Sequence, residues 1–227
     1  MSETITLQAK DGHELDGYVA RPAGEPLGGL VVVQEIFGVN AHIRSVADGW
    51  AKDGFLAVAP ALFDRVERGV ELQYSGADME KARSLAPKLS METSLMDVAA
   101  ALDWVRQQTG RKCGVVGYCL GGSLAWLAAT RLKADAAVGY YGGQIAKHLG
   151  EKPECPVMLH FGKLDKHIPQ TDVDAIESTY PEAPVFRYEA DHGFNCDARA
   201  SFDAESAGLA RVRSLEFLRK QLLAVSR

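Results

Sequence analysis

Short apolar runs alternate with longer amphipathic stretches along most of the chain. Eight of these runs are bounded by glycine, proline or charged residues and have the length and composition of β-strands. They cover residues 3–8, 15–20, 29–34, 55–59, 113–117, 135–140, 156–161 and 185–189. The later runs are continuously apolar, which is typical of strands that are covered on both faces.

Two segments have the spacing of a helix with one apolar face. The first spans residues 91–108, and the second spans residues 199–224 near the end of the chain. Strands that alternate with helices predict an α/β fold, in which a mostly parallel central sheet has helices on both faces. Ligand sites in such a sheet gather at the carboxyl ends of the strands.

No internal repeat, low-complexity tract or flexible linker divides the chain. We therefore expect residues 1–227 to form a single domain. The polar segment 64–90 contains no clear strand. It is expected to form a short excursion near the carboxyl edge of the sheet.

Composition and charge exclude several classes of partner. The net charge of −5, with acidic and basic residues interspersed, offers no basic face for nucleic acid. No apolar stretch approaches the roughly 18 residues of a membrane span, and the first residues lack the apolar core of a signal peptide. We therefore expect a cytoplasmic protein, either a monomer or a small homo-oligomer, that acts on a small molecule.

The most informative segment is an apolar run at 113–117 that leads into Gly-Tyr-Cys-Leu-Gly-Gly and then into an apolar helix. This is the Gly-x-nucleophile-x-Gly elbow, with Cys119 where serine is commoner. Any Cβ at Gly117 or Gly121 would crowd the strained turn. The following helix favours a thiolate at Cys119 and leaves the N–H of Leu120 available to an oxyanion. A tight turn around a buried, inert thiol is the alternative.

A cysteine nucleophile needs a general base and a carboxylate that orients the base. Asp165 and His192 each follow the carboxyl end of a predicted strand. Their order after Cys119 is that of the α/β-hydrolases. His167 is the competing base, although it shares a loop with Asp165.

The remaining histidines and cysteines are interpreted as structural. His160 lies within an apolar run and is expected to pack in the core, whereas His13, His42 and His148 have the context of turn or surface residues. The other cysteines, Cys113, Cys155 and Cys196, have no elbow around them. The chain has no GxGxxG motif or P-loop, and its histidines lack metal-ligand spacing, so we expect no cofactor and no metal.

A charged residue, Glu35, ends the strongly apolar run that starts at residue 29. Burying a carboxylate is costly unless another group balances its charge. A strand end that reaches solvent is the alternative. The loop after this early strand supplies the second oxyanion donor in the predicted fold, which here is the N–H of Ile36.

The segments QEIFGVN and GYCLGG, together with the Asp165 loop and His192, resemble the dienelactone hydrolase family. The similarity covers nearly the whole chain, including DGHELDGYVARP near the start and AVGYYGG at 137–143. It implies an eight-stranded sheet and a triad of Cys119, His192 and Asp165. It also implies that Glu35 holds the resting thiol until substrate arrives, and that the two N–H groups named above bind the oxyanion.

The chain departs from the family where a substrate carboxylate would bind. The family uses two arginines there, and the aligned positions in this chain are Met79 and Cys196. Candidate substrate-binding residues are Lys81, Arg83, Arg199, Phe37 and Tyr140. Because the fork geometry of arginine is not readily replaced, we expect neutral esters to be better substrates than acidic lactones.

Three functions compete. The first is hydrolysis of a small lactone or ester through a thioester, with carboxylesterase activity on neutral esters as its variant. The second is a ligand-binding or sensor protein on a hydrolase fold, which fold alone never excludes. The third is a thiol redox sensor built on Cys119, for which Cys196 is the candidate partner. A complete set of nucleophile, base, acid and oxyanion donors favours the enzyme.

Overall fold

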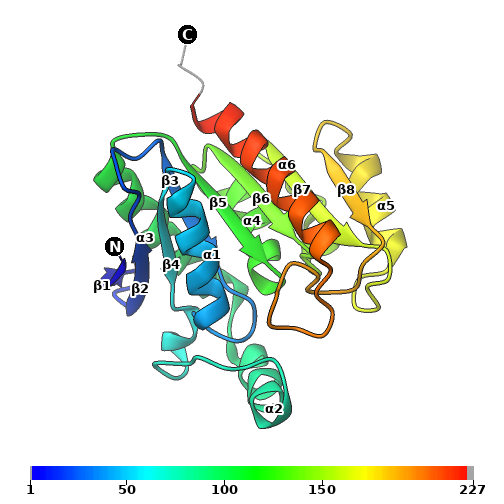
Figure 1. Cartoon of the computed structure of the whole chain (residues 1–227), viewed down its shortest axis with the longest axis horizontal. Helices are drawn as coiled ribbons and strands as arrows, with labels where there is room; N and C mark the ends of the chain where they lie inside the picture. Colours follow the sequence, from blue (N-terminus) through cyan, green and yellow to red (C-terminus); the bar gives the residue numbers. More distant parts are fainter. Residues whose placement is uncertain (1, 224–227) are drawn as a thin grey trace.

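The computed structural model describes residues 2–223, in which eight strands form one sheet (Figure 1). The strands are β1 (Ser2–Gln8), β2 (Glu14–Ala20), β3 (Gly29–Val33), β4 (Leu56–Pro60), β5 (Cys113–Tyr118), β6 (Ala136–Tyr140), β7 (Val157–Gly162) and β8 (Val185–Tyr188). Their order is β1-β2-β4-β3-β5-β6-β7-β8. Strand β2 pairs antiparallel with β1 and β4, and the other pairs are parallel. The predicted α/β fold with a mostly parallel sheet is confirmed.

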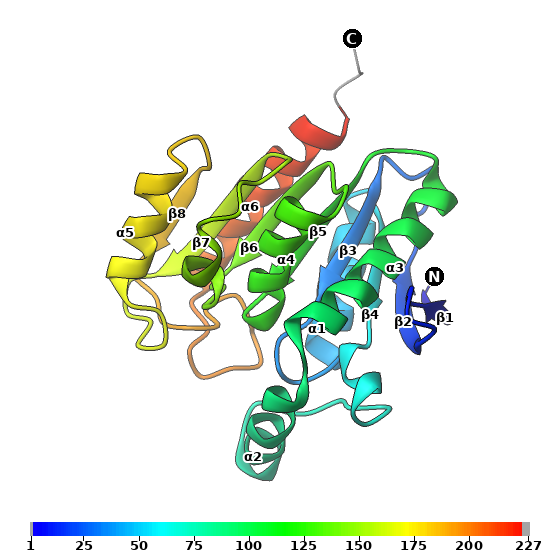
Figure 2. The same ribbon diagram turned by 180° about the vertical axis from the view of Figure 1, so that it is seen from behind.

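Helices cover both faces of this sheet. Helices α1 (Ala41–Lys52) and α6 (Ala204–Leu222) lie on the face shown in Figure 1, whereas α3 (Met91–Thr109), α4 (Leu120–Arg131) and α5 (Gln170–Thr179) lie on the face shown in Figure 2. Helix α2 (Gly76–Leu85) projects beyond the sheet. Among the described residues, no helix is both long enough and apolar enough to span a membrane.

The central strands are buried on both faces, as their continuous apolar sequence predicts. Every residue of β3, β4, β5, β6 and β7 is buried. The outer strand β1 instead has mostly exposed residues. The parallel strands therefore form the core, and their carboxyl ends converge at one edge.

The predicted strand boundaries agree with the observed ones to within one residue. The final helix differs, because it begins at Ala204 rather than at residue 199. Asp203 caps it by accepting the N–H of Ser206 at 2.8 Å, and the preceding residues form turns. The segment 64–90 contains the end of one short 3-10 turn, η1 (Leu62–Arg65), then α2, and then a second such turn, η2 (Ala86–Lys88).

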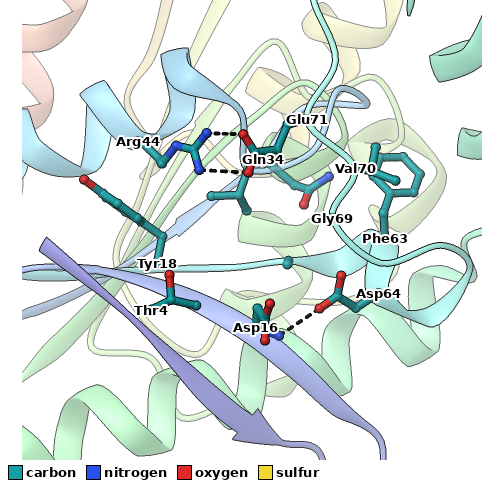
Figure 3. Close-up of a pocket in the computed structure, with 12 residues that line it drawn as sticks. Thr4, Asp16, Tyr18, Gln34, Arg44, Phe63, Asp64, Gly69, Val70 and Glu71 are labelled. Carbon is teal, nitrogen blue, oxygen red and sulfur yellow. Dashed lines mark hydrogen bonds and ion pairs between the residues drawn. The ribbon is translucent and has the colours of Figure 1, made fainter.

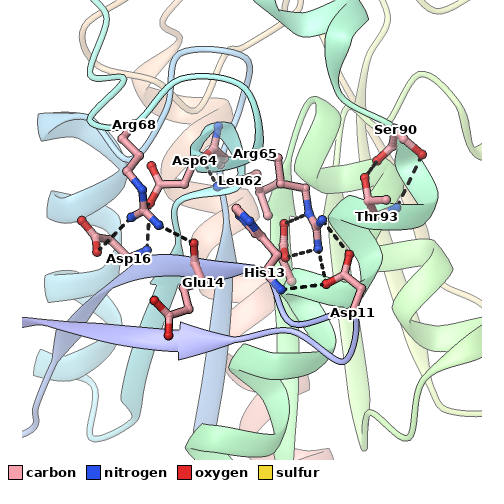
Figure 4. Close-up of polar contacts among 12 residues, drawn as sticks. Asp11, His13, Glu14, Asp16, Leu62, Asp64, Arg65, Arg68, Ser90 and Thr93 are labelled. Atoms are coloured by element: carbon pink, nitrogen blue, oxygen red, sulfur yellow. Dashed lines mark hydrogen bonds and ion pairs between the residues drawn. The ribbon is translucent and has the colours of Figure 1, made fainter.

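Arg65 anchors the start of this segment to the buried Asp97 of helix α3 and to Asp11 of the turn between β1 and β2. Figure 4 shows its pair with Asp11. Arg65 donates from Nε and Nη2 to the two carboxylate oxygens of Asp97, at 2.7 and 2.8 Å. Its Nη1 also lies 2.8 Å from Asp11. The Asp97 side chain has no exposed surface, so Arg65 supplies its charge balance.

A cavity of about 80 Å³ lies nearby, between β2 and the loop that follows β4 (Figure 3). Arg44 and Glu71 form an ion pair at its side. The carboxylate of Asp64 accepts the N–H of Asp16 at 2.8 Å. Among the described residues, the lining of this cavity contains neither a cysteine nor a histidine.

We expect Arg65→Met to lower the free energy of unfolding by about 3 kcal/mol, because it leaves the buried Asp97 carboxylate unpaired. Urea denaturation measures this change. Arg21→Met, which removes an exposed ion pair with Glu3, is the control and should cost at most about 1 kcal/mol. Equal losses in the two variants would contradict a special role for the buried pair.

Candidate active site

A cavity of about 490 Å³ opens at the carboxyl ends of the parallel strands. Its lining comes from the loop after β3, from α2, from the start of α4, and from the loops after β7 and β8. Cys119, His192 and Ile36 all lie on this surface. The cavity is therefore where the strand order predicts a ligand site.

The turn after β5 has the backbone of a nucleophile elbow. Cys119 has a φ of 55° and a ψ of −112°, a conformation that L-residues rarely adopt. A Cβ at Gly117 would overlap the carbonyl oxygen of Gly121, and a Cβ at Gly121 would overlap the carbonyl oxygen of Val33. Both glycines are therefore required by close backbone approach, as the sequence predicts.

His192 connects the thiol to a buried carboxylate. Its Nε2 lies 3.2 Å from the Sγ of Cys119, and its Nδ1 lies 2.7 Å from the Oδ2 of Asp165. Since a carboxylate only accepts hydrogen bonds, the proton is on Nδ1 and Nε2 faces the thiol. The other oxygen of Asp165 accepts the N–H of His167 at 2.8 Å, which fixes its orientation.

His167 also lines the cavity, but it does not connect to the thiol. Its ring meets the ring of His192 edge to face, with centroids 5.3 Å apart. Within residues 2–223, the ring nitrogens of His167 form no hydrogen bond with Cys119. Geometry therefore favours His192 over His167 as the base.

The surroundings of His192 stabilise its imidazolium form. Burial alone disfavours the charge, but the hydrogen bonds to Asp165 and Cys119 outweigh it and raise the pKa of His192 to about 10. A proton on His192 is thus best held when Cys119 is a thiolate. Because its pKa is raised in the folded chain, protonated His192 also adds to the free energy of unfolding. This contribution is complete below the ordinary histidine pKa of about 6.5, and it is lost as the pH rises through about 10.

The other cysteines are poorly suited to attack a substrate. Burial raises the pKa of Cys155 and Cys196 to about 12, and it also raises the pKa of Cys113. Since the thiolate is the nucleophile, these thiols stay unreactive near neutral pH. None of the three lines the cavity.

A second histidine lies close to a serine inside the core. His160 Nε2 is 2.9 Å from the Oγ of Ser214, and His160 Nδ1 is 2.8 Å from the hydroxyl of Tyr188. Both His160 and Ser214 are fully buried, and neither lines the cavity. Burial lowers the pKa of His160 to about 3, which makes it a weak base. The contact is therefore better explained as core packing, as the sequence predicts for His160.

Glu35 is fully buried, and its charge is balanced by Arg199, which lies 164 residues later in the chain. Nη1 of Arg199 lies 3.1 Å from Oε1 of Glu35. The expected resting contact between Glu35 and the Cys119 thiol is absent from the described residues, because Sγ contacts His192 instead. The alternative that Glu35 ends the strand in solvent is wrong.

The two predicted oxyanion donors flank Cys119 in this arrangement. Leu120 is the first residue of α4, so its N–H has no acceptor within the helix. Ile36 and Leu120 both line the cavity. The N–H of Gly121 binds the carbonyl of Gln34 at 3.1 Å, which ties the elbow to the loop that carries Ile36.

The candidate substrate-binding residues divide into two groups. Arg83 and Phe37 line the cavity, as does Arg199. Lys81 was a wrong prediction, because it lies outside the cavity lining and pairs with Glu67 at 2.5 Å on the surface. Tyr140 was also wrong, because it is fully buried and its hydroxyl lies 2.7 Å from Ser214.

The sequence model of the Dienelactone hydrolase family matches residues 15–222. A carboxymethylenebutenolidase of Pseudomonas putida is 36% identical over 227 residues, which cover 96% of each chain. The chain belongs to the dienelactone hydrolase family. By this relationship it is a carboxymethylenebutenolidase-like hydrolase of carboxylic esters.

Solved structures show the same fold as this family member. A provisionally named dienelactone hydrolase from Klebsiella pneumoniae subsp. pneumoniae MGH 78578 has a TM-score of 0.83 and 28% identity, and covers 97% of this chain and 99% of its own. A dienelactone hydrolase-like promiscuous phosphotriesterase, P91, from metagenomic libraries has a TM-score of 0.76 and 20% identity, over 97% and 99% of the chains. At 20% identity, the similarity to P91 shows only that the two chains share a fold.

Sequence reasoning missed two features of this family member's site. The first is the ion pair of Arg199 with Glu35, since the sequence offers Arg199 only as a substitute for a missing arginine. The second is the burial of His42, which has the sequence context of a turn or surface residue but whose Nδ1 lies 3.0 Å from Asp197. The buried charge of Glu35 required a partner, but nothing in the sequence identified which cation would reach it.

We expect the His192 imidazole to titrate near pH 10 in the native chain, as followed by NMR of its ring protons. Cys119→Ser should move this titration to clearly lower pH, because a neutral hydroxyl does not stabilise the imidazolium as a thiolate does. Cys155→Ser is the control and should leave the titration unchanged. An identical His192 titration in native and Cys119→Ser chains would contradict the inferred coupling.

Proposed function

We propose that the chain hydrolyses a small lactone or ester through a thioester acyl-enzyme on Cys119. The observation that carries this proposal is the alignment of Cys119 Sγ, His192 and Asp165 within the cavity. A thiol, a base and an orienting carboxylate at hydrogen-bonding distance are the requirements of covalent acyl transfer. Family membership supports the same class of reaction.

In the first half of the reaction, the Cys119 thiolate attacks the carbonyl carbon. The carbonyl oxygen becomes an oxyanion, which the N–H groups of Ile36 and Leu120 stabilise. Collapse of this intermediate breaks the carbon–oxygen bond and leaves a thioester. The departing oxygen takes the proton held on Nε2 of His192. In a lactone this oxygen stays attached to the acyl chain.

In the second half, water attacks the thioester. Now neutral, His192 accepts a proton from the water, and Asp165 holds the ring in the required tautomer. The carbon–sulfur bond breaks, the carboxylic acid leaves and releases its own proton to solvent, and the thiolate returns to its partnership with the His192 imidazolium. Atoms and charge balance without a cofactor or metal.

Glu35 is proposed to regulate the thiol. In the resting enzyme, its carboxylate would hold the Cys119 thiol, as the family resemblance implies. The ion pair between Glu35 and Arg199 supports a competition between Arg199 and the Cys119 thiol for the Glu35 carboxylate, because a carboxylate engaged by a guanidinium is less available to a thiol. The arrangement with Sγ on His192 then corresponds to the form that is ready to attack.

The substrate is proposed to carry a carboxylate. This revises the expectation from the sequence, because Arg83 and Arg199 reach the cavity from positions that no alignment indicates. Arg83 is exposed and forms no ion pair among the described residues, whereas Arg199 is already neutralised by Glu35. Arg83 is thus the better candidate to attract an anion. The name of the Pseudomonas putida relative denotes a butenolide with a carboxymethylene group, which fits this chemistry.

Hydrolysis of neutral esters is the second candidate. It is favoured by the pairing of Arg199 with Glu35 and by the apolar side chains of the cavity, including Phe37, Leu89 and Met91. The two candidates share the nucleophile and differ only in the role of Arg83. Kinetics on matched acidic and neutral substrates separate them.

We expect Cys119→Ala and His192→Ala to lower kcat/KM by at least about 10³-fold, because the nucleophile and the base act as a unit. Asp165→Asn should cost about 10² to 10⁴-fold through a wrongly held imidazole. Steady-state hydrolysis of a small aryl ester measures each change. Ser214→Ala is the control for the buried serine and should stay within about threefold of the native rate. A larger loss in Ser214→Ala than in Cys119→Ala would contradict the cysteine mechanism.

We expect Arg83→Gln to lower kcat/KM for an acidic dienelactone by about tenfold, or about 1.4 kcal/mol, with little effect on its methyl ester. The matched control is Lys81→Gln, two residues earlier on α2, which removes a cation that lies outside the cavity. Equal effects of Arg83→Gln on acid and ester, or a native preference for the ester, would favour the neutral-ester function.

A further inference from the structure

Behind the catalytic cavity lies a buried cluster that the proposed reaction does not use as a unit. It consists of Glu35, His42 and Cys196, whose ligand atoms all lie within 4.8 Å of one another. All three side chains are buried, and they come from two distant parts of the chain. Glu35 and His42 flank the start of α1, whereas Cys196 belongs to the loop 191–203 that also carries His192.

Two atoms of this cluster lack a hydrogen-bond partner in the described chain. They are Oε2 of Glu35 and Nε2 of His42. Leaving buried polar atoms unpaired costs about 1 to 3 kcal/mol each, and more for charged groups. Their position beside a thiol indicates that something else fills the space between them.

The tautomer of His42 makes Nε2 an acceptor. Nδ1 lies 3.0 Å from the carboxylate of Asp197, which can only accept, so Nδ1 carries the proton and Nε2 presents a lone pair. A carboxylate that holds one ring nitrogen while the other faces a cluster is the usual support of a metal-bound histidine. Glu35 Oε2 presents further lone pairs to the same space. Two buried acceptors that lie within 4.8 Å of a thiol sulfur, and that have no hydrogen-bond partner in the described chain, favour a bound cation.

We infer that Glu35, His42 and Cys196 form a binding site for one divalent metal ion of the zinc class. Thiolate sulfur, imidazole nitrogen and carboxylate oxygen are the three ligand types that zinc takes in proteins. On binding, Cys196 releases its thiol proton to water, and its sulfur bonds to the metal. Oε1 of Glu35 stays with Arg199, and water fills the fourth position.

The metal acts as a clip between the loop 191–203 and the start of α1. It joins Cys196 to His42, and it fixes Glu35 beside the N–H of Ile36. The loop that holds His192 therefore gains a second attachment, independent of the substrate. Because the site is buried, loading requires the loop to open, so slow uptake by the folded chain is expected.

The test uses the full chain with Cys119→Ser, so that the active-site thiol cannot bind metal. We expect one equivalent of Co²⁺ to produce a thiolate-to-cobalt charge-transfer absorption, which Zn²⁺ displaces. Adding Cys196→Ser should abolish this absorption, and adding His42→Gln should weaken Co²⁺ binding at least about tenfold. The matched control is Cys155→Ser in the same background, which should keep it.

Thermal unfolding gives a second readout. Zn²⁺ should raise the Tm of the Cys119→Ser chain and leave that of the Cys119→Ser/Cys196→Ser chain unchanged, because only binding to the native site stabilises it. Circular dichroism checks that each variant is folded, and the His42→Gln variant keeps the test valid if serine at residue 196 disturbs the core. Absence of saturable Co²⁺ binding in the Cys119→Ser chain, or a cobalt–thiolate band that survives Cys196→Ser, would overturn the inference in favour of a bridging water.

Discussion

Close backbone contact at the turn after β5 sets the position of every group in the site. The turn leaves no room for a Cβ at Gly117 or Gly121, because the carbonyl oxygens of Gly121 and Val33 occupy that space. The turn therefore locks β5 and α4 against the end of β3. Cys119 is held at a positive φ, and its thiol is directed into the cavity. The buried residues packed around the turn hold Cys119 in this strained conformation.

The loops after β7 and β8 bring Asp165 and His192 into line with this fixed thiol. Strand β7 ends at Gly162, three residues before Asp165, and β8 ends at Tyr188, four residues before His192. Parallel strands end at the same edge, so short loops are enough to align a carboxylate, an imidazole and a thiol. Selection of the reactive cysteine follows from position, since burial raises the pKa of the other three thiols and Cys119 alone among them faces the cavity.

A second, electrostatic constraint joins the two halves of the site. The buried carboxylate of Glu35 needs a cation, and Arg199 of the loop after β8 supplies it. The guanidinium carbon also lies 5.8 Å from the ring centroids of Phe37 and Tyr74, and these two rings pack against each other. This pairing places a charge next to the substrate cavity and brings Cys196 beside His42. The same pairing therefore underlies both the proposed control of the thiol and the metal site.

The sequence by itself determined the fold class and the strand boundaries to within one residue, and it predicted that Cys119, His192 and Asp165 act together. The structure brings these three side chains to hydrogen-bonding distance. These features are local or ordered along the chain, because apolar runs define strands, glycine spacing defines the elbow, and the order of Asp165 and His192 follows strand ends. Only the tertiary structure decided which cations reach the cavity. Lys81 and Arg83 are two residues apart on one helix, and the sequence gives no reason to prefer either. The orientation of α2 places Arg83 in the lining of the cavity and Lys81 beside Glu67 on the surface. The burial of His42 and its contact with Cys196 likewise depend on the loop 191–203, which packs against the start of α1. His42 and Asp197 of this loop are 155 residues apart, so no local sequence pattern indicates the contact.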